Sequence, residues 1–225
     1  MRDRPISSGG KARQADRADV SEAKAAKFER TRQRILDAAA QVLSTNGFAG
    51  TRLSDIAEQA DLQTPTIYYY FRSREELIEE VMFCGISEMR LHIVRVLDAL
   101  PAHATALDKV MSAMEAHLRH ELELSAYTTA SIRNAGQMPK HLQLRQRKEE
   151  AAYGKIWHGL FVDAISDSGL HSDIDPRTAR LLVMGALNWA AEWWDPRRDS
   201  VETVIQTAQT IVRVAFSSHP QQQAP

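Results

Sequence analysis

Apolar residues recur three or four positions apart along most of the chain, which is the spacing of an amphipathic helix, and no segment alternates as a strand would. The pattern predicts an all-α protein, with helices over about residues 27–46, 53–60, 65–71, 73–97, 105–120, 124–133, 139–168, 176–194 and 201–216. Residues 1–20 carry mixed charges without periodicity, so we expect a disordered basic arm there. Ser21 can cap the first helix, and we expect a second disordered tail over residues 219–225.

Two short helices with a tight turn between them are predicted between Thr51 and Phe71, and a longer helix follows at once. We expect Thr51 to cap the first of them and Thr64 the second, with Pro65 at the first helical position, where its missing N–H costs nothing. Asp61 can adopt the left-handed conformation that the turn needs. This arrangement is a helix-turn-helix, which points to DNA.

The second short helix has few positions to spare for the core. Ile67 and Phe71 lie four apart and can be buried, whereas three consecutive tyrosines on so short a helix cannot all be buried. Exposed tyrosine hydroxyls can donate to phosphate oxygens while the rings contact sugars or thymine methyls in a major groove. Arg74 forms a candidate phosphate clamp at the start of the next helix, and Arg32 lies within reach of a DNA backbone. The predicted DNA-binding residues are Arg32, Arg52, Gln63, Thr64, Pro65, Thr66, Tyr68, Tyr69, Tyr70 and Arg74.

The residues around this motif resemble, in order and spacing, the N-terminal domain of the TetR family of one-component transcriptional regulators. The matching positions are Arg34-Ile35-Leu36, Ala38-Ala39, Leu43, Gly47-Phe48, Thr51, Ile56-Ala57, Ala60, Leu62, Ile67-Tyr68, Tyr70-Phe71, Ser73-Arg74-Glu75 and Leu77. The chain departs from the family at Asp61, where Gly is usual, and at Pro65-Thr66, where Lys or Pro followed by Gly is common. Both departures are compatible with the turn described above. The resemblance implies a DNA-binding domain over residues 21–77 and a helical ligand-binding and dimerisation domain over residues 78–218.

Charge is uneven along the 225 residues, although the net charge is only −1. Residues 1–34 hold ten Lys and Arg against five Asp and Glu, and the remainder holds 18 against 24. A basic segment beside the DNA-reading helices favours DNA binding through counterion release, although a merely solvated tail has the same composition. Cys84 is the only cysteine, which excludes an intramolecular disulfide. With no apolar run of a signal peptide or a membrane span in the sequence, we expect a cytoplasmic protein with no membrane partner.

The last two predicted helices, residues 176–194 and 201–216, carry more apolar surface than the core of a small domain needs. Pairing with the same helices of a second copy would bury this surface in a four-helix bundle. A two-fold homodimer also suits DNA, because it reads two half-sites roughly 34 Å or a multiple of that distance apart. The alternative is that both helices are the internal core of a single chain.

A tryptophan-rich segment, Gly185–Pro196, together with residues 133–139 and the helix through Tyr153 and Trp157, resembles TetR-family members that respond to acyl-coenzyme A thioesters. The resemblance implies a small hydrophobic effector. Methionine and aromatic side chains can line an apolar cavity for it, and nearby basic residues can hold phosphates. The alternatives are that the tryptophans pack in a core or dimer interface and that the basic residues are only solvated. The predicted ligand-binding residues are Met111, Met114, Tyr127, Arg145, Lys148, Tyr153, Trp157, Asn188 and Trp189.

Other chemistry has less support in the sequence. His117 and His120 share a helix face with Glu121, but a zinc site normally needs three or four ligands, so we predict no metal site and no cofactor. The sequence has no Gly-rich phosphate loop, cysteine pair or nucleophile motif, so we predict that the protein is not an enzyme. We predict a repressor that a hydrophobic molecule such as an acyl-coenzyme A thioester releases from its double-stranded DNA operator. The alternatives are a TetR-like regulator with an unrelated effector, such as a drug or a free acid, and an effector-free DNA-binding protein.

Overall fold

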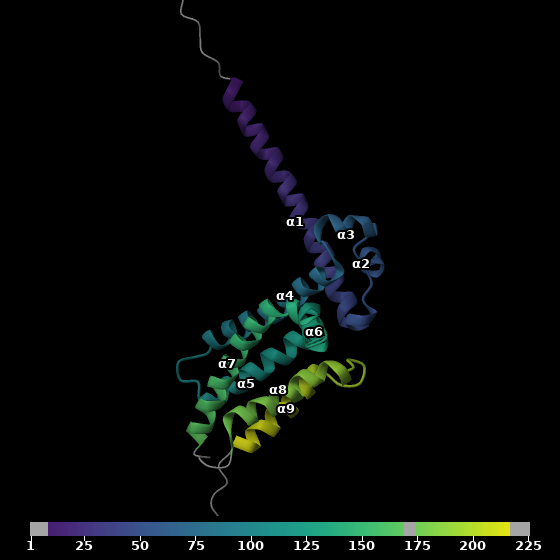
Figure 1. Cartoon of the computed structure of the whole chain (residues 1–225). Helices are drawn as coiled ribbons and strands as arrows, with labels where there is room; N and C mark the ends of the chain where they lie inside the picture. The colour runs from purple at the N-terminus through teal and green to yellow at the C-terminus, as the bar shows by residue number, and fades with distance from the viewer. Residues whose placement is uncertain (1–8, 169–173, 217–225) are drawn as a thin grey trace, which may run out of the picture.

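The computed structural model describes residues 9–168 and 174–216, with side-chain exposures from residue 22 onward. Throughout these ranges the regular elements are helices and none is a strand, which confirms the predicted all-α class. Figure 1 shows a long first helix that projects from the body at its N-terminal end, while the two short helices and the remaining helices lie at its C-terminal end. The elements are α1 (Gly9–Gly50), α2 (Leu53–Gln59), α3 (Thr64–Tyr70), α4 (Arg74–Asp98), α5 (Ala106–Arg119), a π-helical turn η1 (His120–Leu124), α6 (Ala126–Arg133), a 3-10 turn η2 (Lys140–Leu142), α7 (Leu144–Ser168), α8 (Pro176–Trp193) and α9 (Val201–Phe216).

The first helix begins much earlier than the sequence pattern indicated. α1 starts at Gly9 and projects as a rod beyond the folded body (Figure 1), whereas the sequence led us to expect a disordered arm over residues 1–20. Residues 11–18 are rich in Ala, Arg and Gln and contain neither Gly nor Pro, so their intrinsic propensity extends the helix without an apolar face. Residues 1–8 and the predicted tail, 219–225, lie outside the described residues.

The helical path of α1 breaks at Gly47, directly after the helix end that the sequence predicted at about residue 46. Gly47 has φ 69° and ψ 175°, a conformation that side chains disfavour, and a short helical turn runs on from it to Gly50. The buried Thr51 is not the cap of α2, because its hydroxyl donates to the Gly47 carbonyl oxygen at 2.7 Å. α2 begins instead after Arg52, which makes no side-chain capping bond.

The turn of the helix-turn-helix follows the prediction more closely than its caps do. Asp61 has φ 52°, the left-handed conformation expected of it. Gln63, not Thr64, is the capping residue of α3, and no side chain caps the helix. Pro65 is therefore the second helical residue and not the first, although it still lies in the first turn. α4 begins where expected, because the Ser73 hydroxyl accepts a hydrogen bond from the Glu76 backbone N–H at 3.0 Å.

Two apolar cores lie at either end of α4. The first joins α1, α2, α3 and the start of α4 as far as Met82, and it also takes in Ala130 and Met138 from α6 and the segment after it. The second begins at Met89 and joins α4 to α5, α7, α8 and α9. α4 therefore belongs to both cores, and α6 reaches back from the second half of the chain to complete the first.

Two boundaries in the second half differ from the prediction. The helix expected over about residues 124–133 is split at Ser125, because α5 continues into η1 before α6 begins. The helix expected from Pro139 begins only at Leu144, after the short turn η2. In the part of the chain that the structure describes, no helix combines the length and apolarity of a membrane span.

Candidate DNA-binding surface and ligand cavity

The short helix α3 presents an exposed face formed by the residues expected to contact DNA. Ile67 and Phe71 are 1% and 3% exposed and anchor the helix in the first core, as their spacing predicted. On the other face, Tyr68 and Tyr69 are 57% and 75% exposed. Gln63 and Pro65 are also exposed, and Thr64 and Thr66 are half-buried. Large aromatic side chains this exposed are uncommon on a surface without a partner, so this face has the character of a contact surface.

Tyr70 differs from Tyr68 and Tyr69 because its side chain packs against α1. Its ring is half-buried and lies 4.7 Å from the ring of Phe28 on α1, and the Tyr69 ring lies 6.0 Å from the same Phe28. The contacts hold α3 against the long first helix. Tyr70 therefore positions the helix, and Tyr68 and Tyr69 remain available to a partner.

Two of the arginines predicted to contact DNA are engaged within the protein. Arg32 forms an ion pair with Glu80 of α4 at 3.2 Å. Arg74 donates through Nε to the Thr51 carbonyl oxygen at 2.7 Å, through a second nitrogen to the Phe48 carbonyl oxygen, and through the third to Glu75 at 3.1 Å. Its guanidinium therefore ties α4 to the connection between α1 and α2, which differs from the phosphate clamp expected from its position.

Arg52 and Arg72 are the available cations beside α3. Both are exposed, and neither side chain pairs with a carboxylate among the described residues. Arg52 immediately precedes α2, and Arg72 lies between α3 and α4. Sequence reasoning named Arg52 and missed Arg72, although a basic residue directly after the exposed tyrosines was the available signal.

A cavity of about 260 Å³ lies among α4, α5, α6, α7 and α8. Its apolar wall includes Ile86, Met89, Ile132 and Met184, and its polar wall includes Thr128, Ser131 and Tyr153. Enclosure by five helices with a few polar groups is typical of a small-molecule site. The whole lining consists of Gly85, Ile86, Met89, His117, Thr128, Ser131, Ile132, Ala135, Glu150, Tyr153, Gly154, Trp157, Arg180, Leu181, Met184 and Asn188.

A buried polar cluster forms one side of this cavity. His117 Nδ1 lies 2.7 Å from the Tyr153 hydroxyl, and its Nε2 lies 3.3 Å from a carboxylate oxygen of Glu121. Burial raises the pKa of Glu121, and the neighbouring His117 opposes that rise. Burial also raises the pKa of Tyr153, so its hydroxyl keeps its proton. The cluster therefore places the His117 ring between a hydroxyl and a carboxylate at the edge of the cavity.

Two polar side chains that α8 contributes to the cavity lack partners. The Nε of Arg180 and the Oδ1 of Asn188 are buried and form no hydrogen bond with any described residue. Both residues lie on α8, and both line the cavity. Leaving buried polar groups without partners costs free energy, so a ligand that supplies those partners would bind favourably.

The structure brings three of the predicted ligand-binding residues to the cavity, namely Tyr153, Trp157 and Asn188. The other six predicted residues lie elsewhere. Met111 and Met114 are buried in the second core, and Lys148 and Trp189 are exposed outside the cavity. Arg145 pairs with Glu79 and Glu80, and the Tyr127 hydroxyl donates to Asp37 at 2.7 Å. Arg180 and His117 line the cavity but were not among the residues predicted from the sequence. The signal for Arg180 was a single cation on the same face of α8 as Met184 and Asn188, at intervals of four residues.

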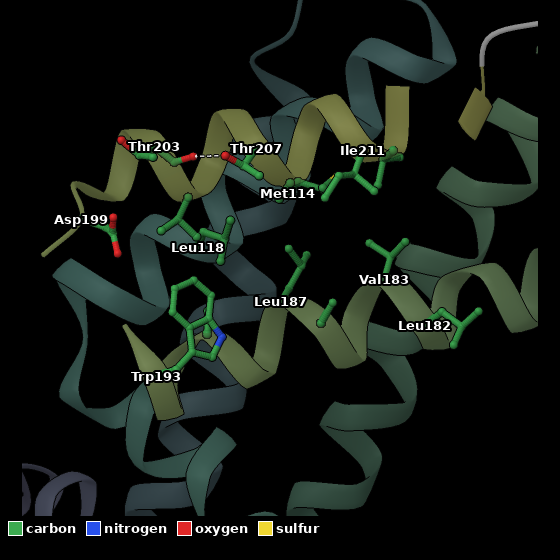
Figure 2. Close-up of a pocket in the computed structure, with 15 residues that line it drawn as sticks. Met114, Leu118, Leu182, Val183, Leu187, Trp193, Asp199, Thr203, Thr207 and Ile211 are labelled. Atoms are coloured by element: carbon green, nitrogen blue, oxygen red, sulfur yellow. Dashed lines mark hydrogen bonds between the residues drawn. The ribbon is translucent and has the colours of Figure 1, made fainter. Parts of the chain in front are cut away.

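A separate apolar groove of about 520 Å³ lies between α8 and α9, with α5 beneath it. Figure 2 shows Val183 and Leu187 of α8 facing Met114 and Ile211 across it, with Trp193 at one end. The rims are apolar and open, because Leu182 is 70% exposed and Ile211 is 66% exposed. Trp189 on α8 is 64% exposed. This exposure contradicts the alternative that both helices are internal core.

α6 connects the cavity to the DNA-binding half. Thr128, Ser131 and Ile132 of α6 line the cavity. At the end of the same helix, Asn134 accepts from the Phe48 backbone N–H at 2.6 Å, and Arg133 donates to the Ser44 carbonyl oxygen at 2.8 Å. A displacement of α6 would therefore move α1 directly, because these hydrogen bonds join the two helices.

The two histidines considered for metal binding have different partners. His117 faces Tyr153 and Glu121, whereas His120 Nδ1 lies 2.9 Å from the Thr128 hydroxyl and its ring lies 4.8 Å from that of His92. Among the described residues, no group of three or more His, Cys, Asp or Glu side chains is arranged to hold a metal ion.

Comparisons with known proteins agree with this architecture. Residues 35–81 match the family described as bacterial regulatory proteins, tetR family, and residues 103–215 match the tetracyclin repressor-like C-terminal domain. The chain is 27% identical over 165 residues to the fatty acid metabolism regulator protein of Bacillus subtilis (strain 168), covering 71% of this chain and 81% of the relative. It is 24% identical over 194 residues to the HTH-type transcriptional repressor KstR2 of Rhodococcus jostii (strain RHA1), covering 83% and 91%.

A solved structure has a similar fold. The crystal structure of AibR in complex with isovaleryl coenzyme A and operator DNA aligns with a TM-score of 0.72 at 16% identity. The alignment covers 80% of this chain and 97% of AibR. At this identity the likeness establishes only the arrangement of the helices. The contacts of this chain must be argued from its own residues.

Proposed function

The chain belongs to the TetR family of bacterial regulatory proteins, and from this premise we propose that it is a homodimeric transcriptional repressor whose operator complex is released by an acyl-coenzyme A thioester. The effector binds in the cavity among α4 to α8. α3 is the recognition helix, and the exposed faces of α8 and α9 hold the two protomers together.

The exposed face of α3 supports DNA reading. Tyr68 and Tyr69 are the exposed aromatics of a helix that the fold presents at one end of the molecule (Figure 1), and Gln63 and Thr66 can offer hydrogen bonds to base edges. Arg52 and Arg72 supply positive charge for phosphates on either side. A partner of this kind also implies a cytoplasmic protein, since bacterial operators lie there.

The apolar surface of α8 and α9 supports a dimer. Leu182, Trp189, Ile211 and Val214 are each at least 60% exposed on these two helices. An isologous contact with the same helices of a second copy would remove this surface from water and relate two α3 helices by a two-fold axis. Two recognition helices in one assembly can then engage two half-sites.

Named relatives support the effector class. The Bacillus subtilis relative is a fatty acid metabolism regulator, and AibR was crystallised in complex with isovaleryl coenzyme A, so acyl compounds are the natural candidates for this chain. The cavity fits such a compound because it combines an apolar wall at Ile86 and Met184 with polar groups at Arg180 and Asn188. A regulator needs no catalytic group, and we propose that the protein does not turn its effector over.

One observation carries the proposed mechanism: α6 lines the cavity on one side and bonds α1 on the other. α6 is also tied to α8, because Arg133 donates to both carboxylate oxygens of Glu192 at 3.1 and 3.3 Å. An effector that displaces α6 would move α1 and its recognition helix relative to α8 and the dimer axis. Operator affinity would fall because the two α3 helices could no longer meet both half-sites, provided that the effector prefers the displaced arrangement.

The test is a titration of acyl-coenzyme A thioesters and the matching free acids into the protein–operator complex. We expect the thioesters to release the DNA, with a coupling free energy of about 1–3 kcal/mol. Failure of every thioester and every acid would reject the acyl effector, whereas DNA binding is tested separately by the affinity of the ligand-free protein. Hydrolysis of a thioester by the protein would contradict the assignment as a regulator without catalysis.

A further inference from the structure

The shape of the cavity restricts which acyl group can occupy it. A volume of about 260 Å³ is roughly that of nine water-sized groups, since a water molecule takes about 30 Å³ of the liquid. A hexanoyl group fits this space, and a palmitoyl group exceeds it about twofold. Expansion to hold the longer chain would separate the closely packed Trp157 and Tyr153, which are 0% and 6% exposed.

Arg180 gives the cavity an unpaired cation. Its Nε has no acceptor, and its guanidinium forms no ion pair with any described residue. Glu150 also lines the cavity, but its carboxylate accepts instead from Gln146 Nε2 at 2.8 Å. A guanidinium without a partner is suited to a carbonyl or carboxylate oxygen of the ligand.

Asn188 lies eight residues further along α8, which is about 12 Å along the helix axis. At that separation the two side chains meet opposite ends of one ligand and not the same oxygen. The Asn188 amide is uncharged and can both donate and accept. The unsatisfied atom is the acceptor Oδ1, so the partner that suits it is an uncharged donor such as a hydroxyl.

We propose that the effector cavity selects a short acyl group of about nine or fewer non-hydrogen atoms, with its carbonyl or carboxylate oxygen at Arg180 and an uncharged polar substituent at Asn188. This inference rests on the proposed function for the biological role of the site, but it concerns binding to the protein alone. Free acids and thioesters share the chemistry that Arg180 recognises, and separate arms of the test distinguish them.

The experiment measures binding to the DNA-free dimer by calorimetry. The ligands are hexanoyl-, 6-hydroxyhexanoyl- and palmitoyl-coenzyme A, each beside its free acid. We expect hexanoyl to bind more tightly than palmitoyl and the hydroxyl to improve affinity. Arg180→Met should weaken all short ligands about tenfold, and Asn188→Leu should remove the gain from the hydroxyl. Arg177→Met, an exposed arginine on the same helix and outside the cavity, is the matched control and should change nothing.

The outcomes separate this inference from the proposed function. The inference is overturned if palmitoyl binds as tightly as hexanoyl, or if both cavity variants keep the wild-type affinity. The proposed function would still stand in that case if a palmitoyl thioester releases the operator. Short ligands that bind through Arg180 but leave the operator complex intact support the inference, and they reject the function if no longer acyl ligand releases the operator. If no acyl ligand binds, both are rejected.

Discussion

The side-chain oxygen of Asn134 accepts a hydrogen bond from the backbone N–H of Phe48 at 2.6 Å, which joins the end of α6 to the corner where α1 breaks. The amide nitrogen of Asn134 donates to the Leu43 carbonyl oxygen at 3.3 Å, and the side chain is completely buried. A single residue thus supplies both a donor and an acceptor to the DNA-binding half from a helix that lines the cavity.

Asn134→Ala should weaken the coupling between effector and operator. The variant leaves the partly buried Phe48 N–H without its acceptor, which costs about 1–3 kcal/mol of stability. We expect effector affinity of the free protein to stay near that of the wild type while the operator release produced by a saturating effector becomes smaller. Gln137→Ala is the control, because the Gln137 side chain is exposed and its amide donates to the Arg133 carbonyl oxygen at 3.2 Å and not to α1. Full release by effector in the Asn134 variant would show that α6 does not transmit the signal through this contact.

Tyr68→Ala should weaken operator binding by about 1–3 kcal/mol with little change in stability. The Tyr68 side chain is 57% exposed, so its removal leaves the packing of Ile67 and Phe71 unchanged. Fluorescence anisotropy with labelled operator measures the first quantity, and thermal denaturation measures the second. Wild-type operator affinity in this variant would count against α3 as the recognition helix.

Arg72→Ala should lower DNA affinity and Arg74→Ala should lower stability, although the two residues are only two positions apart. Arg72 is exposed, so its loss should weaken binding to all DNA sequences and lower the salt dependence, with stability unchanged. Arg74 donates to the Thr51 and Phe48 carbonyl oxygens, so its loss should lower stability by about 1–3 kcal/mol. Urea denaturation measures the stability of each variant, and operator affinity at several salt concentrations measures the phosphate contacts. If Arg74 were a phosphate contact, Arg74→Ala would lower the salt dependence of operator affinity as Arg72→Ala does, with stability unchanged.

Local spacing in the sequence was sufficient to predict α3. The burial of Ile67 and Phe71 and the exposure of Tyr68 follow from positions on one short helix, and the structure agrees with them. The arginines were harder, because Arg32 pairs with Glu80, which is 48 positions away. Such a pairing depends on how α1 crosses α4, and helical periodicity contains no information on that crossing.

The cavity was predicted only in part for the same reason. Trp157 and Asn188 were identified from a resemblance, whereas Met111 and Met114 shared the expected composition but point into the second core. Which side of α5 faces the cavity depends on its contacts with α7 and α9. Arg180 became visible as a candidate only when its Nε proved to have no partner in the folded chain.

His120 should make stability depend on pH below neutrality. Burial, with smaller contributions from His92 and His117, lowers its pKa from 6.5 to about 4. The unfolded chain takes up this proton near pH 6.5 and the folded chain only near pH 4, so the stability contributed by neutral His120 is complete above pH 6.5 and is lost as the pH falls to 4. We expect a loss of roughly 1–2 kcal/mol over this window, allowing for solvent near the ring.

His120→Gln isolates this effect, because Glu121 and His117 are unchanged in the variant. Urea denaturation at several pH values should give a flatter profile for His120→Gln than for the wild type. His103→Gln changes an exposed histidine between α4 and α5 and should retain the wild-type slope. Parallel profiles for His120→Gln and the wild type would show that His120 is not the titrating group.

Leu182→Glu should convert the dimer into monomers. Leu182 is 70% exposed on a single chain, so its replacement costs the isolated fold little, but a carboxylate on the proposed interface would lie against the apolar surface of the partner protomer without a counter-ion. Leu144→Glu is a matched control, because Leu144 is 67% exposed at the start of α7. Sedimentation at micromolar concentration should give monomers for Leu182→Glu and dimers for the control. Operator affinity should fall in the same variant, since one protomer reaches one half-site; a dimeric Leu182→Glu protein would place the interface elsewhere.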